Sequence, residues 1–95
     1  MIVAEVSIVP LGEGTSVRRY VKAAIQALQT SGLNILVGPM STTVEAKTLE
    51  ELNLAVSSAH ETLFKLGAKR VVTTLKIDDR RDKEASIKSK LAAVE

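Results

Sequence analysis

The chain has 95 residues, of which 45% are hydrophobic and 25% charged, and its 13 basic and 11 acidic side chains leave a formal charge of +2. This length suits one modest core, so we expect residues 1–95 to form a single domain. The small charge surplus and the presence of only two aromatic residues argue against nucleic acid as a partner. The absence of cysteine excludes a disulfide framework, a thiolate nucleophile and a cysteine metal site.

The first predicted element is a strand over Ile2–Leu11, which is rich in Val and Ile. It alternates as a strand does and lacks a basic start, so it does not resemble an export signal. No apolar run approaches the roughly 20 residues that span a bilayer. We therefore expect a cytoplasmic protein with no membrane partner.

Gly12–Ser16 is predicted as a loop in which Thr15 or Ser16 caps the following helix. Glycines before a helix can also bind an anion, but this loop lacks the length and the lysine of a phosphate loop. A capping loop is therefore the favoured interpretation.

The next three elements follow in quick succession. Val17–Leu28 carries apolar residues at helical spacing, and Gly32 supplies a left-handed stop. Ile35–Val37 and Thr42–Ala46 are predicted as two short strands. The turn signal Gly38–Ser41 between them indicates a hairpin.

A second helix is predicted from Thr48, because Thr48 and Glu51 form the spacing of a capping box. Gly67 is expected to end it. Arg70–Asp78 is predicted as the last strand, and Ser86–Val94 as a short closing helix.

This β-α-β-β-α-β order predicts an α+β, ferredoxin-like sandwich with an antiparallel sheet in the order 4-1-3-2, plus a short C-terminal helix. Two helices cover one face of such a sheet. We assign to the covered face Ala4, Val6, Ile8, Val44, Val71, Leu75 and Ile77. The open face then carries one residue of the strand 35–37 together with Val3, Glu5, Ser7, Val9, Thr43, Glu45, Val72, Thr74 and Lys76.

The open face is apolar at its margins and polar near its centre. It is either a half-solvated face of the usual alternating kind or the surface through which two sheets pack as a homo-oligomer. In the second case Glu5 and Glu45 need partners, because buried carboxylates are costly alone. A ligand or a neighbouring subunit would supply these partners.

The sequence offers no convincing catalytic group and no metal site. His60 is the lone histidine, and its position at the edge of an apolar helical stripe is typical of a packing role. The charged run Asp78–Lys83 alternates in sign, which favours a self-compensating segment or a subunit contact. A binding protein without a cofactor is the better interpretation.

Six segments together resemble the small thiamine-binding protein family, which is related to YkoF. They follow the same order along nearly the whole chain, and they are Ala4–Gly12, Thr15–Ser16, Gly38–Glu45, Ala59–Glu61, Gly67–Arg70 and Ile77–Lys83. The resemblance implies a ferredoxin-like fold, subunits that pair through their sheets as dimers or tetramers, and binding of thiamine or its hydroxymethylpyrimidine part. It implies no enzymatic activity.

The open face suits such a ligand. Glu5 or Glu45 could offset the thiazolium charge and accept hydrogen bonds from the pyrimidine amine. Three hydroxyls and one thioether could complete the site, and they belong to Ser7, Thr43, Thr74 and Met40.

Two alternatives stay open. The first is an oligomeric regulatory or structural module without a small ligand, in which Lys76 of a neighbouring subunit would satisfy the glutamates. The second is an enzyme acting on a pyrimidine or a phosphate ester through His60 and a carboxylate.

Overall fold

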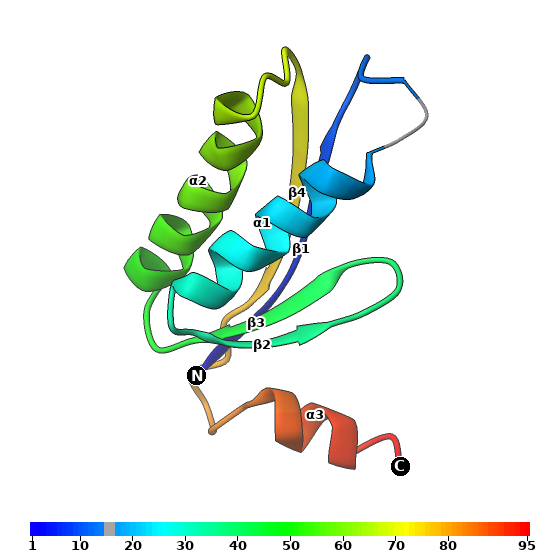
Figure 1. The fold of residues 1–95 in the computed structure, drawn as a ribbon. Coiled ribbons are helices and arrows are strands. Elements are labelled where there is room, and N and C mark those ends of the chain that lie inside the picture. The colour runs from blue at the N-terminus through cyan, green and yellow to red at the C-terminus, as the bar shows by residue number, and fades with distance from the viewer. Residues whose placement is uncertain (15–16) are drawn as a thin grey trace.

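The structure is a computed structural model that describes residues 1–14 and 17–95. All seven predicted elements are present, and each strand bound lies within one residue of its predicted position. In chain order (Figure 1) the elements are β1 (Ile2–Pro10), α1 (Arg18–Thr30), β2 (Asn34–Val37), β3 (Thr42–Ala46), α2 (Leu49–Lys65), β4 (Val71–Asp78) and α3 (Ile87–Ala92).

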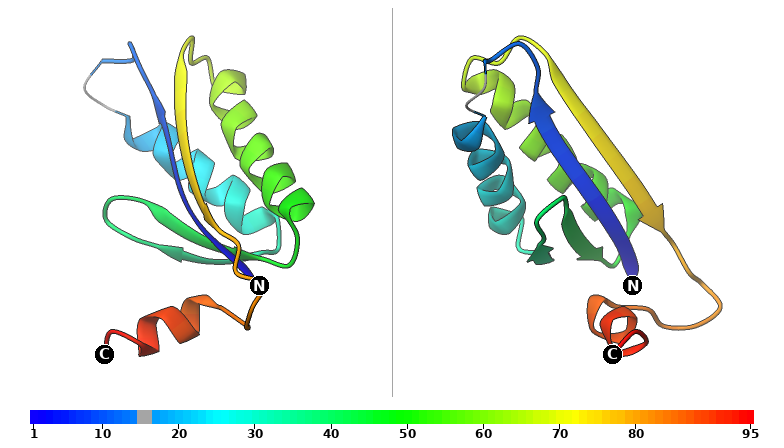
Figure 2. Two further views of the ribbon diagram at one scale, coloured as in Figure 1. Left: turned by 180° about the vertical axis from the view of Figure 1, so that it is seen from behind. Right: turned by 90° about the vertical axis from the view of Figure 1, so that its right-hand side faces the viewer.

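The four strands form one antiparallel sheet in the order β2-β3-β1-β4, which confirms the predicted ferredoxin-like arrangement. Helices α1 and α2 lie on the same face of this sheet (Figure 2). The sheet is uneven, because β1 has nine residues whereas its neighbour β3 has five.

The core lies between the sheet and these two helices, and it is almost entirely aliphatic. Val44, Leu52 and Leu63 are completely buried there. Most of the predicted covered face is confirmed as part of this core or packed against it. Ile77 is the exception, with 40% of its surface exposed, because it lies near the end of an edge strand.

The first turn of α1 is fixed by side chains rather than by a polar cap. Its N-cap residue is Val17, and the two predicted caps, Thr15 and Ser16, lie outside the described residues. The guanidinium of Arg19 stacks 4.5 Å from the centre of the buried Tyr20 ring and donates a hydrogen bond of 2.9 Å to its hydroxyl. Tyr20 is thereby held between α1 and the core.

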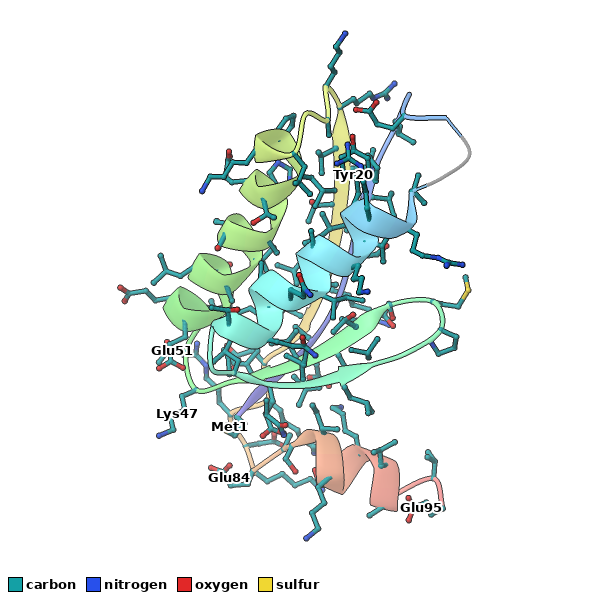
Figure 3. All side chains as sticks on the ribbon, viewed as in Figure 1. Met1, Tyr20, Lys47, Glu51, Glu84 and Glu95 are labelled. Carbon is teal, nitrogen blue, oxygen red and sulfur yellow. The ribbon has the colours of Figure 1, made fainter. Side chains whose placement is uncertain are left out.

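Three helix-end predictions can be compared with the structure. Gly32 and Gly67 follow their helices with φ of +82° and +106°, a conformation that favours glycine. The Glu51 amide donates to the Thr48 hydroxyl at 3.2 Å, as predicted. The reciprocal bond differs, because the Glu51 carboxylate accepts from the amide of Lys47 at 3.3 Å instead (Figure 3).

The short helix α3 packs against one end of the face that the sequence predicted to be open. Ser86 and Ser89 form a capping box at its start. Val3, Ala85 and Ile87 are all buried, although a two-layer sandwich would leave Val3 in solvent. The prediction of a fully open face was therefore wrong at this end, because the chain after β4 returns to cover it.

The segment between β4 and α3 is a set of neighbouring ion pairs, as predicted. Arg80 pairs with Asp82 at 2.7 Å, and Arg81 pairs with Asp79 at 2.9 Å. Hydrogen bonds from these guanidinium groups lower the pKa of both carboxyls below their usual value of 3.8. The segment is exposed, so these pairs order it locally and add little to overall stability.

Candidate functional site

The strand register arranges the side chains of the open face in four rows. From the α3 end outward, the rows are Asn34–Glu45–Val3–Asp78, then Leu36–Thr43–Glu5–Lys76, then Ser7–Thr74, and finally Val9–Val72. Helix α3 packs over the middle of the first row, at Val3 and Glu45. The other three rows stay accessible in the single chain.

Glu5 lies at the centre of the second row, between Thr43 and Lys76 on the neighbouring strands. Its carboxylate accepts a hydrogen bond of 3.0 Å from the hydroxyl of Ser41, which belongs to the turn between β2 and β3. Around it is a hollow of about 240 Å³ lined by Val3, Ala4, Glu5, Thr43, Lys76, Asp78 and Lys90. Two of the six predicted ligand-binding residues, Glu5 and Thr43, therefore line one hollow.

Glu45 has a partner within the chain. Its carboxylate accepts a hydrogen bond of 2.6 Å from the amide of Ile87 in the first turn of α3, and another of 3.4 Å from Asn34. A carboxylate at this position also suits the positive end of the helix dipole. The partner that the sequence analysis expected from a ligand or a subunit is thus supplied by α3.

Further ion pairs hold the tail against the sheet. The ammonium group of Lys90 lies 2.6 Å from Asp78, which is on the same row as Glu45. The amino-terminal nitrogen of Met1 lies 3.3 Å from the carboxylate of Glu84 (Figure 3). Helix α3 therefore has both apolar and charged contacts to the sheet.

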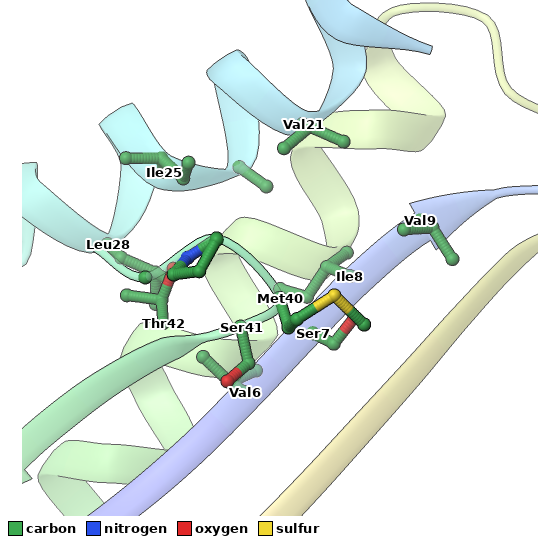
Figure 4. A pocket seen from close by; sticks show the side chains of 13 residues that line it. Val6, Ser7, Ile8, Val9, Val21, Ile25, Leu28, Met40, Ser41 and Thr42 are labelled. Carbon is green, nitrogen blue, oxygen red and sulfur yellow. The ribbon is translucent and has the colours of Figure 1, made fainter. Parts of the chain in front are cut away.

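A second hollow, a cleft of about 230 Å³, opens between α1, β1 and the β2–β3 turn (Figure 4). Its walls are mostly apolar and carry a few hydroxyls, and the lining residues are Val6, Ser7, Ile8, Val9, Val21, Ala24, Ile25, Leu28, Gly38, Pro39, Met40, Ser41 and Thr42. The cleft therefore contains two further predicted residues, Ser7 and Met40. Ser41 lines the cleft and also bonds to Glu5, so it connects the two hollows.

The six predicted residues thus do not form one cluster. Glu5 and Thr43 line the face hollow, Ser7 and Met40 line the cleft, Glu45 is bound to α3, and Thr74 lies opposite Ser7 outside both linings. Sequence reasoning missed Ser41. The sequence did place Ser41 in the turn directly before β3. Because β3 pairs with β1, a side chain at that position can reach a residue of β1 such as Glu5.

His60 lies on the other side of the sheet, between α2 and β4. Its Nδ1 is 2.6 Å from the hydroxyl of Thr73, and its ring packs at a tilt against Phe64 with 5.4 Å between centroids. It lines neither hollow. These contacts account for the histidine as a packing residue.

Residues 1–14 and 17–95 include no group of three His, Cys, Asp or Glu side chains that could hold a metal ion. Within the same ranges, no helix is both long and apolar enough to cross a membrane.

The fold and the two small hollows define a ferredoxin-like α+β protein with room for a small polar ligand beside the sheet. Residues 4–95 match the family model described as thiamine-binding protein. The chain belongs to this family, which confirms the resemblance seen in the sequence.

Similar proteins from several organisms support this assignment. The chain is 44% identical to a UPF0045 protein of Methanothermobacter thermautotrophicus over 99% of this chain and 96% of that one. It is 36% identical to the UPF0045 protein YqgV of Bacillus subtilis over 99% and 94% of the two chains.

Two solved structures have the same fold. A protein of Methanocaldococcus jannaschii superposes with a TM-score of 0.91 at 45% identity, over 98% of this chain and 94% of that one. A protein of Thermotoga maritima, provisionally assigned to thiamine biosynthesis or salvage, superposes with a TM-score of 0.84 at 28% identity over 99% and 98% of the two chains.

Proposed function

We propose that this chain is a non-catalytic, homo-oligomeric binding protein of the cytoplasm whose ligand is thiamine or its hydroxymethylpyrimidine part. The ligand lies at the sheet face, beside the interface between subunits. The observation that carries the proposal is the position of Glu5. Its carboxylate is exposed on the face, lines the face hollow, and is bonded to Ser41, which lines the cleft.

The chemistry of Glu5 suits this ligand. A carboxylate offsets the positive charge of a thiazolium ring and accepts hydrogen bonds from an exocyclic amine, and charge-assisted bonds of this kind are the stronger ones. The Ser41 hydroxyl orients the carboxylate. Thr43, opposite Glu5 on β3, offers a further hydroxyl.

The sizes of the hollows favour a shared site. Pockets that enclose a drug-sized ligand usually exceed about 300 Å³. At about 230 and 240 Å³, neither hollow encloses a two-ring ligand alone. A ligand such as thiamine therefore extends from one hollow toward the other, and a second subunit closes the site.

The accessible rows of the face support that second subunit. Leu36 and Val72 are 44% and 39% exposed on the same face as the half-buried Val9. Exposed apolar side chains that share one face are typical of a surface that another protein covers. A second copy that packs its own sheet here would bury them.

Isothermal titration calorimetry with thiamine and with hydroxymethylpyrimidine tests the proposal. We expect saturable binding of both compounds by the wild type and at least tenfold weaker binding of thiamine by Glu5→Gln, because the variant loses the charge that offsets the thiazolium ring but keeps the shape. Glu61→Gln, the same change on the helix side, is the matched control and should bind as the wild type does. A wild type that shows neither heat nor thermal stabilisation at millimolar ligand contradicts the proposal.

The internal partner of Glu45 favours a second candidate, an oligomeric regulatory or structural module without a small ligand. In that case Glu5→Gln would change the oligomer mass rather than ligand binding. Sedimentation velocity of the same variants separates the two functions.

A further inference from the structure

The unequal lengths of β1 and β3 leave part of the sheet unpaired on one side. The register between the two strands ends at Val6 and Thr42. Strand β1 continues to Pro10, and over this last stretch it pairs with β4 alone. A notch one strand wide therefore lies beside Ile8–Pro10, in the place where β3 would continue.

The direction of the backbone groups in this notch follows from one hydrogen bond. The amide of Leu11 donates to the carbonyl of Arg70, the residue just before β4, at 2.9 Å. In an antiparallel ladder both polar groups of a residue point to the same neighbour, and successive residues alternate. The odd-numbered residues of β1 thus face β4, and the N–H and C=O of Ile8 point into the notch.

Both groups of Ile8 are available. Within residues 1–14 and 17–95, no backbone or side-chain group bonds to its N–H or its C=O. The next residue that faces the notch is Pro10, which has no N–H and therefore limits further strand pairing. Ile8 is 6% exposed, and buried amides without a partner are rare in proteins.

The notch forms the floor of the cleft described above. Ile8 lines that cleft, and the half-buried side chains of Val21 and Ile25 on α1 form the opposite wall (Figure 4). A flat ring bound in this cleft would contact the apolar side chains of α1 with its face and the N–H and C=O of Ile8 with its edge. Small-molecule sites commonly combine these two features.

We propose that this notch binds a planar aminopyrimidine ring edge-on, with the backbone of Ile8 as its recognition group. The exocyclic amine donates to the Ile8 carbonyl, and the adjacent ring nitrogen accepts from the Ile8 amide, as a residue of a neighbouring strand would do. The identity of the pyrimidine rests on the proposed function. The recognition of an adjacent donor and acceptor rests on the notch itself.

The geometry also determines where the rest of the ligand lies. At about 230 Å³ the cleft takes one ring, so a second ring lies outside it. Ser7 and Ser41 line the cleft, and Ser41 bonds to Glu5 on the open face. A cationic second ring attached to the pyrimidine therefore lies next to the Glu5 carboxylate. Met40, which is 88% exposed on the turn, can cover the bound ring with its flexible thioether.

Amide hydrogen exchange read by NMR tests the proposal on the intact protein. In the free protein the amide of Ile8 should exchange faster than those of Ser7 and Val9, which face β4. Saturating 4-amino-5-hydroxymethyl-2-methylpyrimidine should slow the exchange of Ile8 by at least tenfold. The analogue with an oxo group in place of the amine should bind at least tenfold more weakly, because it presents an acceptor where a donor is needed.

A steric variant gives independent evidence. Val21→Trp fills the cleft from α1 and should reduce pyrimidine binding by at least tenfold, whereas Lys22→Trp on the exposed side of the same turn should not. If Val21→Trp unfolds, the exchange measurement on the wild type decides alone. The proposal is overturned if the Ile8 amide is already protected in the free oligomer, or if the pyrimidine binds without slowing its exchange.

These outcomes also separate this inference from the proposed function. Thiamine binding with no effect at Ile8 would leave the proposed function standing and remove the notch as its site. Protection of Ile8 by 4-aminopyrimidine, without any binding of thiamine, would keep the notch and remove thiamine as the ligand.

Discussion

Two glutamates on one sheet face have different roles because of the groups that surround them. Glu5 is exposed and is bonded to a single flexible hydroxyl, so its charge is available to a ligand. Glu45 is half-buried and accepts from the first amide of α3. The same side chain therefore acts in recognition at one position and in folding at the other.

Glu45→Gln should loosen α3 without unfolding the sheet. The change replaces a charge-assisted bond to a helix amide by a neutral one, so we expect a loss of about 1 kcal/mol. The amide of Ile87 should exchange faster, and urea titration should show the lower stability. Glu61→Gln, the same change at an exposed position on α2, is the control. An unchanged exchange rate at Ile87 would contradict the role assigned to Glu45.

For single residues, the sequence shows which side chains share a face of the sheet but not which of them have hydrogen-bond partners. The alternation of β1 places Glu5 correctly on the open face. The partner of Glu45 lies 42 residues further along the chain, in a tail whose docking no local pattern specifies. Ser41 and the free backbone of Ile8 were missed for a related reason, since both depend on where β3 stops.

The elements themselves were predictable, because their signals are local. Glycine ends α1 and α2, and alternation marks the long strands. The difference in length between β1 and β3 was also visible in the sequence. Its consequence, an unpaired edge next to α1, appears only when the strand register is known.

The charged segment before α3 should give a pH-dependent contribution to stability. Asp79 and Asp82 have a lowered pKa in the folded chain because Arg81 and Arg80 donate to them. A lowered pKa stabilises the fold above the usual value of 3.8, and this contribution is lost as pH falls through the lower folded value.

The double variant Arg80→Gln, Arg81→Gln tests this effect. Its Tm should be slightly below that of the wild type at pH 7 in low salt, since exposed pairs contribute little. The difference should shrink as pH falls below 3.8 and disappear once pH lies below the lowered folded pKa values. It should also disappear in high salt, because exposed charges are screened. A difference that persists at low pH would show that the arginines act through packing instead.

At the scale of the whole molecule, α3 decides how a second copy can approach. The helix occupies the row that contains Val3, so two sheets would meet through the rows that remain accessible. The order 4-1-3-2 was predictable because short connections leave few topologies. The position of α3 was not, since six helical residues could dock at several places.

Val72→Asp should break the proposed oligomer. Val72 is 39% exposed in the row farthest from α3, and an unpaired charge buried at an interface is strongly unfavourable. Sedimentation velocity should show a smaller assembly. Leu54→Asp, at a 66% exposed position on α2, is the control and should leave the mass unchanged. If Leu54→Asp reduces the mass and Val72→Asp does not, the interface lies on the helix side instead.

The small number of aromatic residues has a practical consequence for optical measurements. The chain has one tyrosine and no tryptophan, so its near-ultraviolet spectrum comes almost entirely from a single buried ring. That ring lies one turn before Ala24, a residue of the cleft wall, with Arg19 stacked on it. Its fluorescence emission and circular dichroism thus report on how α1 packs against the core, without any added label. An aminopyrimidine absorbs in the same spectral region, where this protein contributes little background.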